Sequence, residues 1–170
     1  VDPTRMPAHF GLRMALESNS VEEAVQRLES FGMASSAHIL LGDATTCLGL
    51  EFTKTTFAHV RPDATGRVVH TNHLLGKHPG ETDTVWLKDS LTRMETMTEN
   101  VEKLGEEPSW EEISALFEDE HNAPCSINRL ATEESESGTL FNIVMDLKSK
   151  TAILKMGRPT EVEETINLEL

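Results

Sequence analysis

Polar side chains that could stabilise a developing negative charge follow a short apolar run near the middle of the chain. A Val-Val pair at 68–69 leads directly into His70, Thr71, Asn72 and His73. The apolar run is typical of a strand, and a strand end is a common place for side chains that face a site. The NH2 group of an Asn placed there can donate to the oxyanion of an acyl-transfer intermediate. Asn72 is therefore a candidate oxyanion donor, and a turn cap is the alternative.

A second polar stretch begins after Pro124. Cys125, Ser126 and Arg129 lie close together in a run that favours a strand. The planar guanidinium of Arg129 is suited to an anionic substrate group, with Ser126 beside it. Cys125 could be a nucleophile, but the sequence places no base next to it, so a spectator thiol is the preferred interpretation.

Cofactor motifs are missing from the sequence. It has no Gly-rich phosphate loop, no nucleophile elbow of the G-x-S-x-G type and no HExxH. A zinc site at His70, His73 and His78 is the one metal alternative, and the irregular spacing of these residues disfavours it. We therefore expect neither a metal nor an organic cofactor.

Charge and hydropathy limit the classes of partner. The net charge is −14, from 29 acidic and 15 basic residues, which argues against nucleic acid. The acidic residues occur in short clusters, which favours a solvated surface over a metal site. No apolar run approaches the roughly 18 residues of a membrane span. The two cysteines form no CxxC pair, so the sequence favours a reducing, cytoplasmic location.

The elements that must position these residues can be read from hydrophobic periodicity. Apolar residues at helical spacing predict a helix at 7–18 and another after Ser20, where Ser20 and Glu23 form a capping box and Gly32 ends the helix. Further on, Trp86 to Leu104 predicts a long amphipathic helix, and Ser109 with Glu112 caps another.

Short β-branched or apolar runs predict strands, and they lie in two groups: 37–41, 45–52, 56–60 and 67–70, then 126–130, 139–146, 151–156 and 165–170. The order is helices, strands, helices and strands, without β-α alternation. This pattern predicts an α+β fold with mainly antiparallel sheets covered by helices, in a single domain over 1–170.

Seven collinear pieces of the chain resemble the C-terminal portion of the isopenicillin N acyltransferase family. They are PTRMPAHFGLRMALES at 3–18, GMASSAHILLGD at 32–43, LGLEF at 48–52, GRVVHTNHLL at 66–75, PCSINR at 124–129, TLFNIVMD at 139–146 and MGRPT at 156–160. Their length and their order indicate common ancestry.

The resemblance implies an αββα sandwich of the N-terminal-nucleophile class. The family's precursor cuts itself immediately before a Cys, whose new α-amino group is its own general base. The Cys forms an acyl-enzyme from an amide or a thioester such as acyl-coenzyme A. No part of this chain matches the segment that carries the nucleophile, so we expect a companion segment or chain in a heterodimer.

The same resemblance assigns roles to individual residues. Asn72, in His-Thr-Asn-His, matches the family's oxyanion donor, and His73 beside it is a candidate for substrate binding. Ser126 and Arg129 match a Ser-Ile-Cys-Arg pattern, although Asn128 replaces its Cys. Thr53 stands where the family has Ser. Ser135 matches a Ser-Arg-Gly run, in which Glu136 replaces the Arg.

Two classes of function follow from these observations. One is an amide acyltransferase or amidohydrolase whose nucleophile lies outside this chain. The other is an inactive relative that serves as a binding scaffold. The retained Asn72 favours the enzyme, because a scaffold needs no oxyanion donor. A peroxisomal location is open by family resemblance, but Asn167 to Leu170 is not a clear Ser-Lys-Leu-type address.

Overall fold

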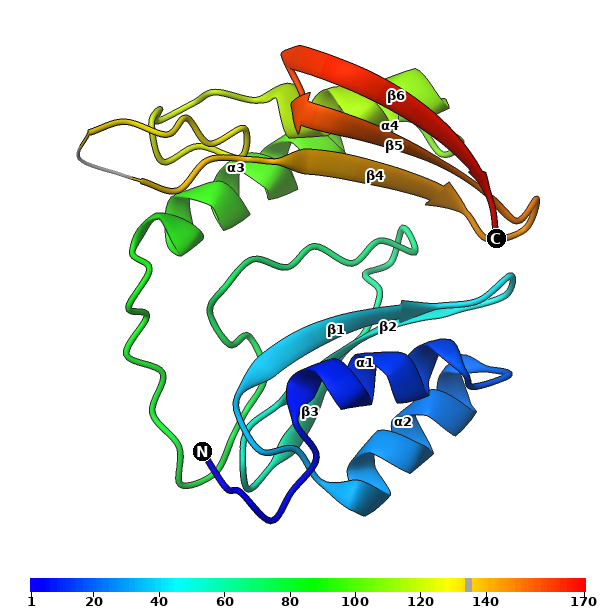
Figure 1. Cartoon of the computed structure of the whole chain (residues 1–170), viewed down its shortest axis with the longest axis vertical. Helices are drawn as coiled ribbons and strands as arrows, with labels where there is room; N and C mark the ends of the chain where they lie inside the picture. The colour runs from blue at the N-terminus through cyan, green and yellow to red at the C-terminus, as the bar shows by residue number, and fades with distance from the viewer. Residues whose placement is uncertain (134–135) are drawn as a thin grey trace. The chain divides into compact units, whose positions relative to one another are not determined.

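The computed structural model describes residues 1–133 and 136–170, which divide into two units, 1–86 and 87–170. Each unit contains two α-helices and a three-stranded antiparallel sheet within the described residues (Figure 1). The predicted α+β class with antiparallel sheets is therefore confirmed for each unit.

The first unit opens with helices α1 (Ala8–Leu16) and α2 (Val21–Phe31). Ser20 Oγ accepts a hydrogen bond from the Glu23 N–H at 3.1 Å, as predicted for an N-cap. The Glu23 carboxylate, however, accepts from the backbone N–H of Asn19 at 3.0 Å, so the predicted reciprocal box is shifted by one residue. Gly32, at φ 67°, ends α2.

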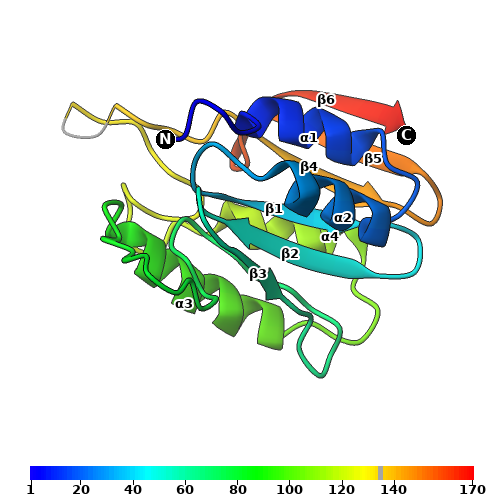
Figure 2. The ribbon, with the colours of Figure 1, turned by 90° about the horizontal axis from the view of Figure 1, so that it is seen from below.

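Strands β1 (Ala37–Gly42), β2 (Cys47–Phe52) and β3 (Phe57–Val60) form a meander in the order β1-β2-β3. Alternation gives the sheet two different faces. Ile39 lies opposite Leu50 on the apolar face, against which α1 and α2 pack (Figure 2). His38 lies opposite Glu51 on the other face.

The prediction of a fourth strand at 67–70 is wrong. These residues are irregular, and they are held by a side chain instead of a strand ladder, because His70 Nε2 lies 2.7 Å from the Glu51 carboxylate. A buried hydrogen bond to a charged group is a strong enough interaction to replace a short ladder.

The second unit contains α3 (Asp89–Glu102), α4 (Trp110–Ala115), the 3-10 helix η1 (Leu116–Glu118), β4 (Phe141–Asp146), β5 (Thr151–Arg158) and β6 (Glu161–Glu169). Helix α4 begins with the complete predicted capping box of Ser109 and Glu112. The sheet order is β4-β5-β6, and Lys155 Nζ on β5 donates to Ser114 Oγ on α4 at 2.7 Å.

The prediction of a strand at 126–130 is also wrong. Ser126 Oγ donates to the carbonyl of Asn128 at 2.6 Å, which closes a local turn. Asn128 Nδ2 then donates to Thr160 Oγ1 at 2.7 Å. The segment therefore folds back on itself and is tied to the β5–β6 connection, because its short polar side chains compete with a ladder for the backbone.

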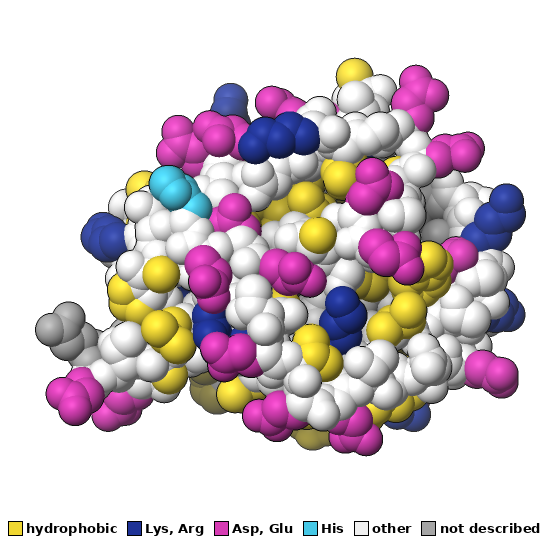
Figure 3. Space-filling view, turned by 90° about the horizontal axis from the view of Figure 1, so that it is seen from above, with side chains coloured by type: hydrophobic (Ala, Val, Ile, Leu, Met, Phe, Trp, Pro, Cys, Tyr) yellow, Lys and Arg dark blue, Asp and Glu magenta, His cyan; other side chains and the backbone are white. Residues whose placement is uncertain are grey.

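Acidic side chains are distributed over the surface that Figure 3 presents, and they are not gathered at one point. This distribution agrees with the net charge of −14 and with solvated carboxylates. None of the described helices is long and apolar enough to cross a bilayer.

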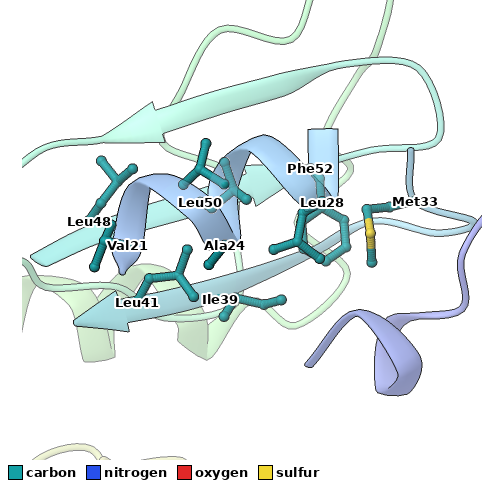
Figure 4. Packing of buried hydrophobic residues seen from close by; sticks show 10 residues of the cluster. Val21, Ala24, Leu28, Met33, Ile39, Leu41, Leu48, Leu50 and Phe52 are labelled. Atoms are coloured by element: carbon teal, nitrogen blue, oxygen red, sulfur yellow. The ribbon is translucent and has the colours of Figure 1, made fainter. Parts of the chain in front are cut away.

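The apolar core of the first unit lies between α2 and the sheet (Figure 4). Leu28 of α2 and Leu50 of β2 are both fully buried there. Burial of a leucine side chain contributes about 1.5–3 kcal/mol. This core fixes the position of β2, and so of the polar residues on the opposite face of that strand.

Truncation of a buried helical leucine should therefore destabilise the protein far more than truncation of an exposed one. We expect Leu28→Ala to lower the free energy of unfolding by about 2–5 kcal/mol, because it leaves a cavity. The matched control is Leu16→Ala at the end of α1, where the side chain is 83% exposed, with an expected effect within about 0.5 kcal/mol. Urea unfolding measures both, and similar losses in the two variants would contradict this packing.

Candidate functional site

A buried carboxylate lies at the centre of the polar face of the β1-β2-β3 sheet. Glu51, the last but one residue of β2, has no exposed surface. Its cross-strand neighbours are His38 on β1 and Ala58 on β3. An isolated charge in such a place is costly, so its hydrogen-bond partners decide what the site is.

Four donors surround the Glu51 carboxylate. Oε1 accepts from His70 Nε2 at 2.7 Å and from the Leu75 N–H at 2.6 Å. Oε2 accepts from the Gly76 N–H at 2.7 Å and from His78 Nε2 at 3.3 Å. Burial raises the pKa of Glu51, but the four hydrogen bonds outweigh burial and lower that pKa to about 2. Glu51 is therefore ionised near neutral pH.

His70 forms a buried ion pair with this carboxylate. Its Nε2 faces the ionised Glu51, and its Nδ1 lies 2.6 Å from the carbonyl oxygen of Thr71. Both of these oxygens can only accept a hydrogen bond, so the ring satisfies both contacts only when both nitrogens carry a proton. His70 therefore links the carboxylate to the backbone of its own segment.

His38 stacks flat on His70, with ring centroids 3.6 Å apart and planes 2° from parallel. Burial and, to a lesser extent, the nearby His70 ring lower the pKa of His38 to about 4, although Glu51 acts in the opposite direction. His38 is therefore neutral near pH 7. Gly49 makes the room for it, since a Cβ there would lie 2.5 Å from His38 Nε2.

A chain of side-chain hydrogen bonds runs from the Glu51 carboxylate to Thr53, the residue after the end of β2. His78 Nδ1 lies 2.8 Å from Thr56 Oγ1, which lies 2.9 Å from Thr53 Oγ1. Thr53 Oγ1 also accepts from the N–H groups of Thr55 and Thr56, so its own proton is directed to a neighbouring hydroxyl. The buried hydroxyl of Thr53 is thus fixed in orientation.

An open pocket of about 540 Å³ adjoins this cluster. His38, Thr53, His70 and Asn72 contribute to its wall, and so does the segment 81–84. The structure therefore brings two residues that the sequence singled out, Asn72 and Thr53, to one pocket. Most of the residues that line the pocket are polar.

The other predicted site residues lie elsewhere or in different surroundings. His73 follows Asn72, and its Nδ1 lies 3.3 Å from Thr71 Oγ1. In the second unit, the Arg129 guanidinium is paired with the Asp89 carboxylate, and Ser126 donates to a backbone carbonyl. Substrate binding by His73, Ser126 and Arg129 stays a prediction. Ser135 lies outside the described residues.

Sequence reasoning missed the role of Glu51. The residue stands inside Leu-Gly-Leu-Glu-Phe, which predicts a buried strand. A charged residue within an otherwise apolar strand is rarely buried without a partner, and that was the available signal. The partner residues, 19 to 27 positions away, could not be identified from spacing.

Metal binding by the histidines finds no geometric support in the part of the chain that the structure describes. No group of three or more His, Cys, Asp or Glu side chains there is arranged to hold a metal ion. His70 and His78 instead donate to opposite oxygens of Glu51.

Comparison with known proteins shows similarity over nearly the whole chain. The family model described as acyl-coenzyme A:6-aminopenicillanic acid acyl-transferase matches residues 2–161. The acyl-coenzyme A:6-aminopenicillanic-acid-acyltransferase 40 kDa form of Emericella nidulans is 42% identical over 166 residues. This alignment covers 96% of the chain but 46% of the relative, so the chain spans about half the length of that protein.

The stacked histidines predict a specific dependence of stability on pH. Because the folded pKa of His38 is about 4 and its ordinary pKa in an unfolded chain is 6.5, the unfolded chain binds more protons between these values. Stability from His38 is therefore complete above pH 6.5 and is lost as the pH falls towards 4. Glu51, with a folded pKa of about 2, loses its contribution only as the pH falls below 4.5.

We expect the stability of His38→Phe to change less between pH 6.5 and 4 than that of the unchanged protein. The phenylalanine keeps a flat ring against His70 but cannot be protonated. The decrease below pH 4.5 should remain. Urea midpoints measured across this range test the prediction. An unchanged slope above pH 4.5 in the variant would show that His38 is not the titrating group.

Proposed function

The chain belongs to the acyl-coenzyme A:6-aminopenicillanic acid acyl-transferase family, and we propose that it forms the oxyanion-binding part of an acyl-transfer enzyme. The observation that carries this proposal is the position of Asn72 in the wall of the 540 Å³ pocket, which Thr53 with its oriented hydroxyl also lines. A side-chain amide at a pocket wall is the type of donor that acyl-transfer sites use for the oxyanion.

The proposed chemistry uses a Cys at the N-terminus of a companion segment as the nucleophile. Its α-amino group takes the thiol proton, and the sulfur attacks the carbonyl carbon of an amide or a thioester. The oxygen gains negative charge and accepts from Asn72 Nδ2. Collapse of this intermediate expels the amine or the thiol, which receives the proton, and leaves a thioester between the Cys and the acyl group.

The acyl group then passes to a second nucleophile. An amine attacks the thioester carbonyl, the oxyanion forms again at Asn72, and the Cys leaves as the thiol. Water in place of the amine would give hydrolysis. From the activity named for the Emericella nidulans relative, we propose an acyl-coenzyme A thioester as acyl donor and an amine of the 6-aminopenicillanic acid class as acceptor.

The fold of each unit supports the N-terminal-nucleophile class. Each unit supplies helices and an antiparallel three-stranded sheet, which are the layer types of an αββα sandwich. Sheets of three strands have two edges each, and exposed edges are a liability unless another strand pairs with them. We propose that strands of the companion segment extend these sheets.

The first test concerns Asn72. In the enzyme assembled with its companion segment, we expect Asn72→Ala to lower kcat by roughly 10²–10³ and to leave the fold intact, because one oxyanion donor is removed. Asn72→Asp, which keeps the size but replaces the donor with a carboxylate, should be at least as damaging. Steady-state kinetics with an acyl-coenzyme A donor measure both effects.

Cys125→Ser is the control for this experiment. The Cys125 sulfur lies 3.5 Å from Arg129 Nη1 and has no base among its described contacts, so activity should persist. Full activity in Asn72→Ala would remove Asn72 from the mechanism. Loss of activity in folded Cys125→Ser would place the nucleophile in this chain.

The second test concerns the companion segment. We expect purified active enzyme to contain, besides residues 1–170, a polypeptide whose first residue is Cys. Intact-mass spectrometry and N-terminal sequencing identify it, and its replacement by Ser or Ala should abolish the acyl-enzyme. Activity from the 18.9 kDa chain alone would contradict the proposal and would require a nucleophile within this sequence.

A further inference from the structure

The segment that carries Asn72 is attached to one side chain at both of its ends. Two residues before Asn72, His70 Nε2 donates to Glu51 Oε1 at 2.7 Å. Three and four residues after it, the N–H groups of Leu75 and Gly76 donate to Oε1 and Oε2 at 2.6 and 2.7 Å. The loop between these contacts has no strand to fix its path.

The anchor itself is rigid. Glu51 lies in the central strand of its sheet, paired with His38 of β1 and with Ala58 of β3. Its side chain has no exposed surface, and four donors fix the carboxylate. A site built on a strand and locked by hydrogen bonds is held more precisely than one built on a loop alone.

Gly76 shows how closely the loop is drawn onto this anchor. A Cβ on Gly76 would lie 2.8 Å from Glu51 Oε2 and 2.5 Å from the Cβ of Ala58. The backbone reaches the carboxylate because residue 76 has no side chain. The contact is therefore built into the loop at a position where a larger residue does not fit.

We infer that Glu51 is a positioning residue for Asn72: its carboxylate holds the 70–76 segment at both ends and so keeps the Asn72 amide at the pocket wall. This inference rests on the proposed function of Asn72. Glu51 does not contact the reacting atoms in this assignment. It acts by reducing the range of positions that Asn72 can adopt, and misplacement of a catalytic group by about 1 Å can cost roughly 10²-fold in rate.

The charge of Glu51 provides the means of testing this role. Glu51→Gln keeps the size of the side chain but replaces one oxygen with an NH2 group. That group faces donors on either side, because Oε1 and Oε2 each accept from a histidine and from a backbone N–H. The hydrogen bond from the N–H of either Leu75 or Gly76 must therefore break. Glu51→Asp keeps both acceptors on a shorter side chain and serves as the conservative variant.

The experiment is a double-mutant cycle in the assembled enzyme, with Glu51→Gln, Asn72→Ala and the two combined. We expect Glu51→Gln to lower kcat by roughly 10- to 100-fold with little change in KM, and Glu51→Asp to restore part of the loss. In the Asn72→Ala background, Glu51→Gln should change kcat by less than about twofold, because the residue through which it acts is absent.

Amide hydrogen exchange gives a readout that does not depend on activity. We expect Glu51→Gln to accelerate exchange at Leu75 or Gly76 by roughly tenfold or more, since a charge-assisted hydrogen bond is lost. Exchange at Leu48 and Leu50, in the β1–β2 ladder, is the internal control for folding. If Glu51→Gln does not fold, the same cycle and the same exchange measurement are made with Glu51→Asp.

The possible results distinguish failure of the proposed function of Asn72 from failure of the positioning role of Glu51. Full activity in Asn72→Ala overturns the proposed function and the inference together. A large loss in Asn72→Ala with normal kcat in Glu51→Gln leaves the proposed function standing and overturns the inference. An equal loss from Glu51→Gln in both backgrounds shows that Glu51 acts on something other than Asn72, which also overturns it.

Discussion

The hydrogen bonds to the buried carboxylate of Glu51 are the interaction on which the rest of the first unit depends. A charge without exposed surface is stable only when enough donors surround it, and here four do so from a segment of nine residues, 70–78. The carboxylate thus replaces the strand ladder that this segment lacks. The hydrogen bonds that offset the cost of burying this charge come from the segment that carries Asn72. The carboxylate therefore also holds that segment in place.

The two faces of the β1-β2-β3 sheet carry different groups: one contributes to the apolar core, and the other carries the polar cluster around Glu51. Leu48, Leu50 and Phe52 of β2 pack towards the helices, while Glu51 and Thr53 point to the polar face. A register slip of one residue would exchange the two sets, so the apolar core also fixes the register of the polar cluster. The packing of α2 therefore determines where the polar cluster and the adjoining pocket lie, although no residue of α2 lines the pocket.

The sequence predicted the elements that depend on residues close together in the chain. The meander of β1 to β3 and the capping box of α4 follow from alternation and from Ser109 with Glu112, all within a few residues. The strands predicted at 67–70 and 126–130 failed because side chains distant in sequence, Glu51 and Thr160, hold those segments. Asn72 was identified from the family resemblance and from its polar neighbours. Glu51 was not identified, because a long-range hydrogen bond leaves no periodic signal.

The glycines of the polar face have a consequence for how this pocket can change. At positions 49 and 76 a single methyl group would collide with His38 or with the carboxylate, so a larger residue there requires the neighbouring groups to move. In the segment 81–84, which lines the pocket, Asp83 accepts hydrogen bonds from the N–H groups of Leu74 and Val85, while Thr82 is exposed. We therefore expect changes in the size or polarity of the pocket to arise at exposed lining positions such as Thr82 more readily than at the two glycines.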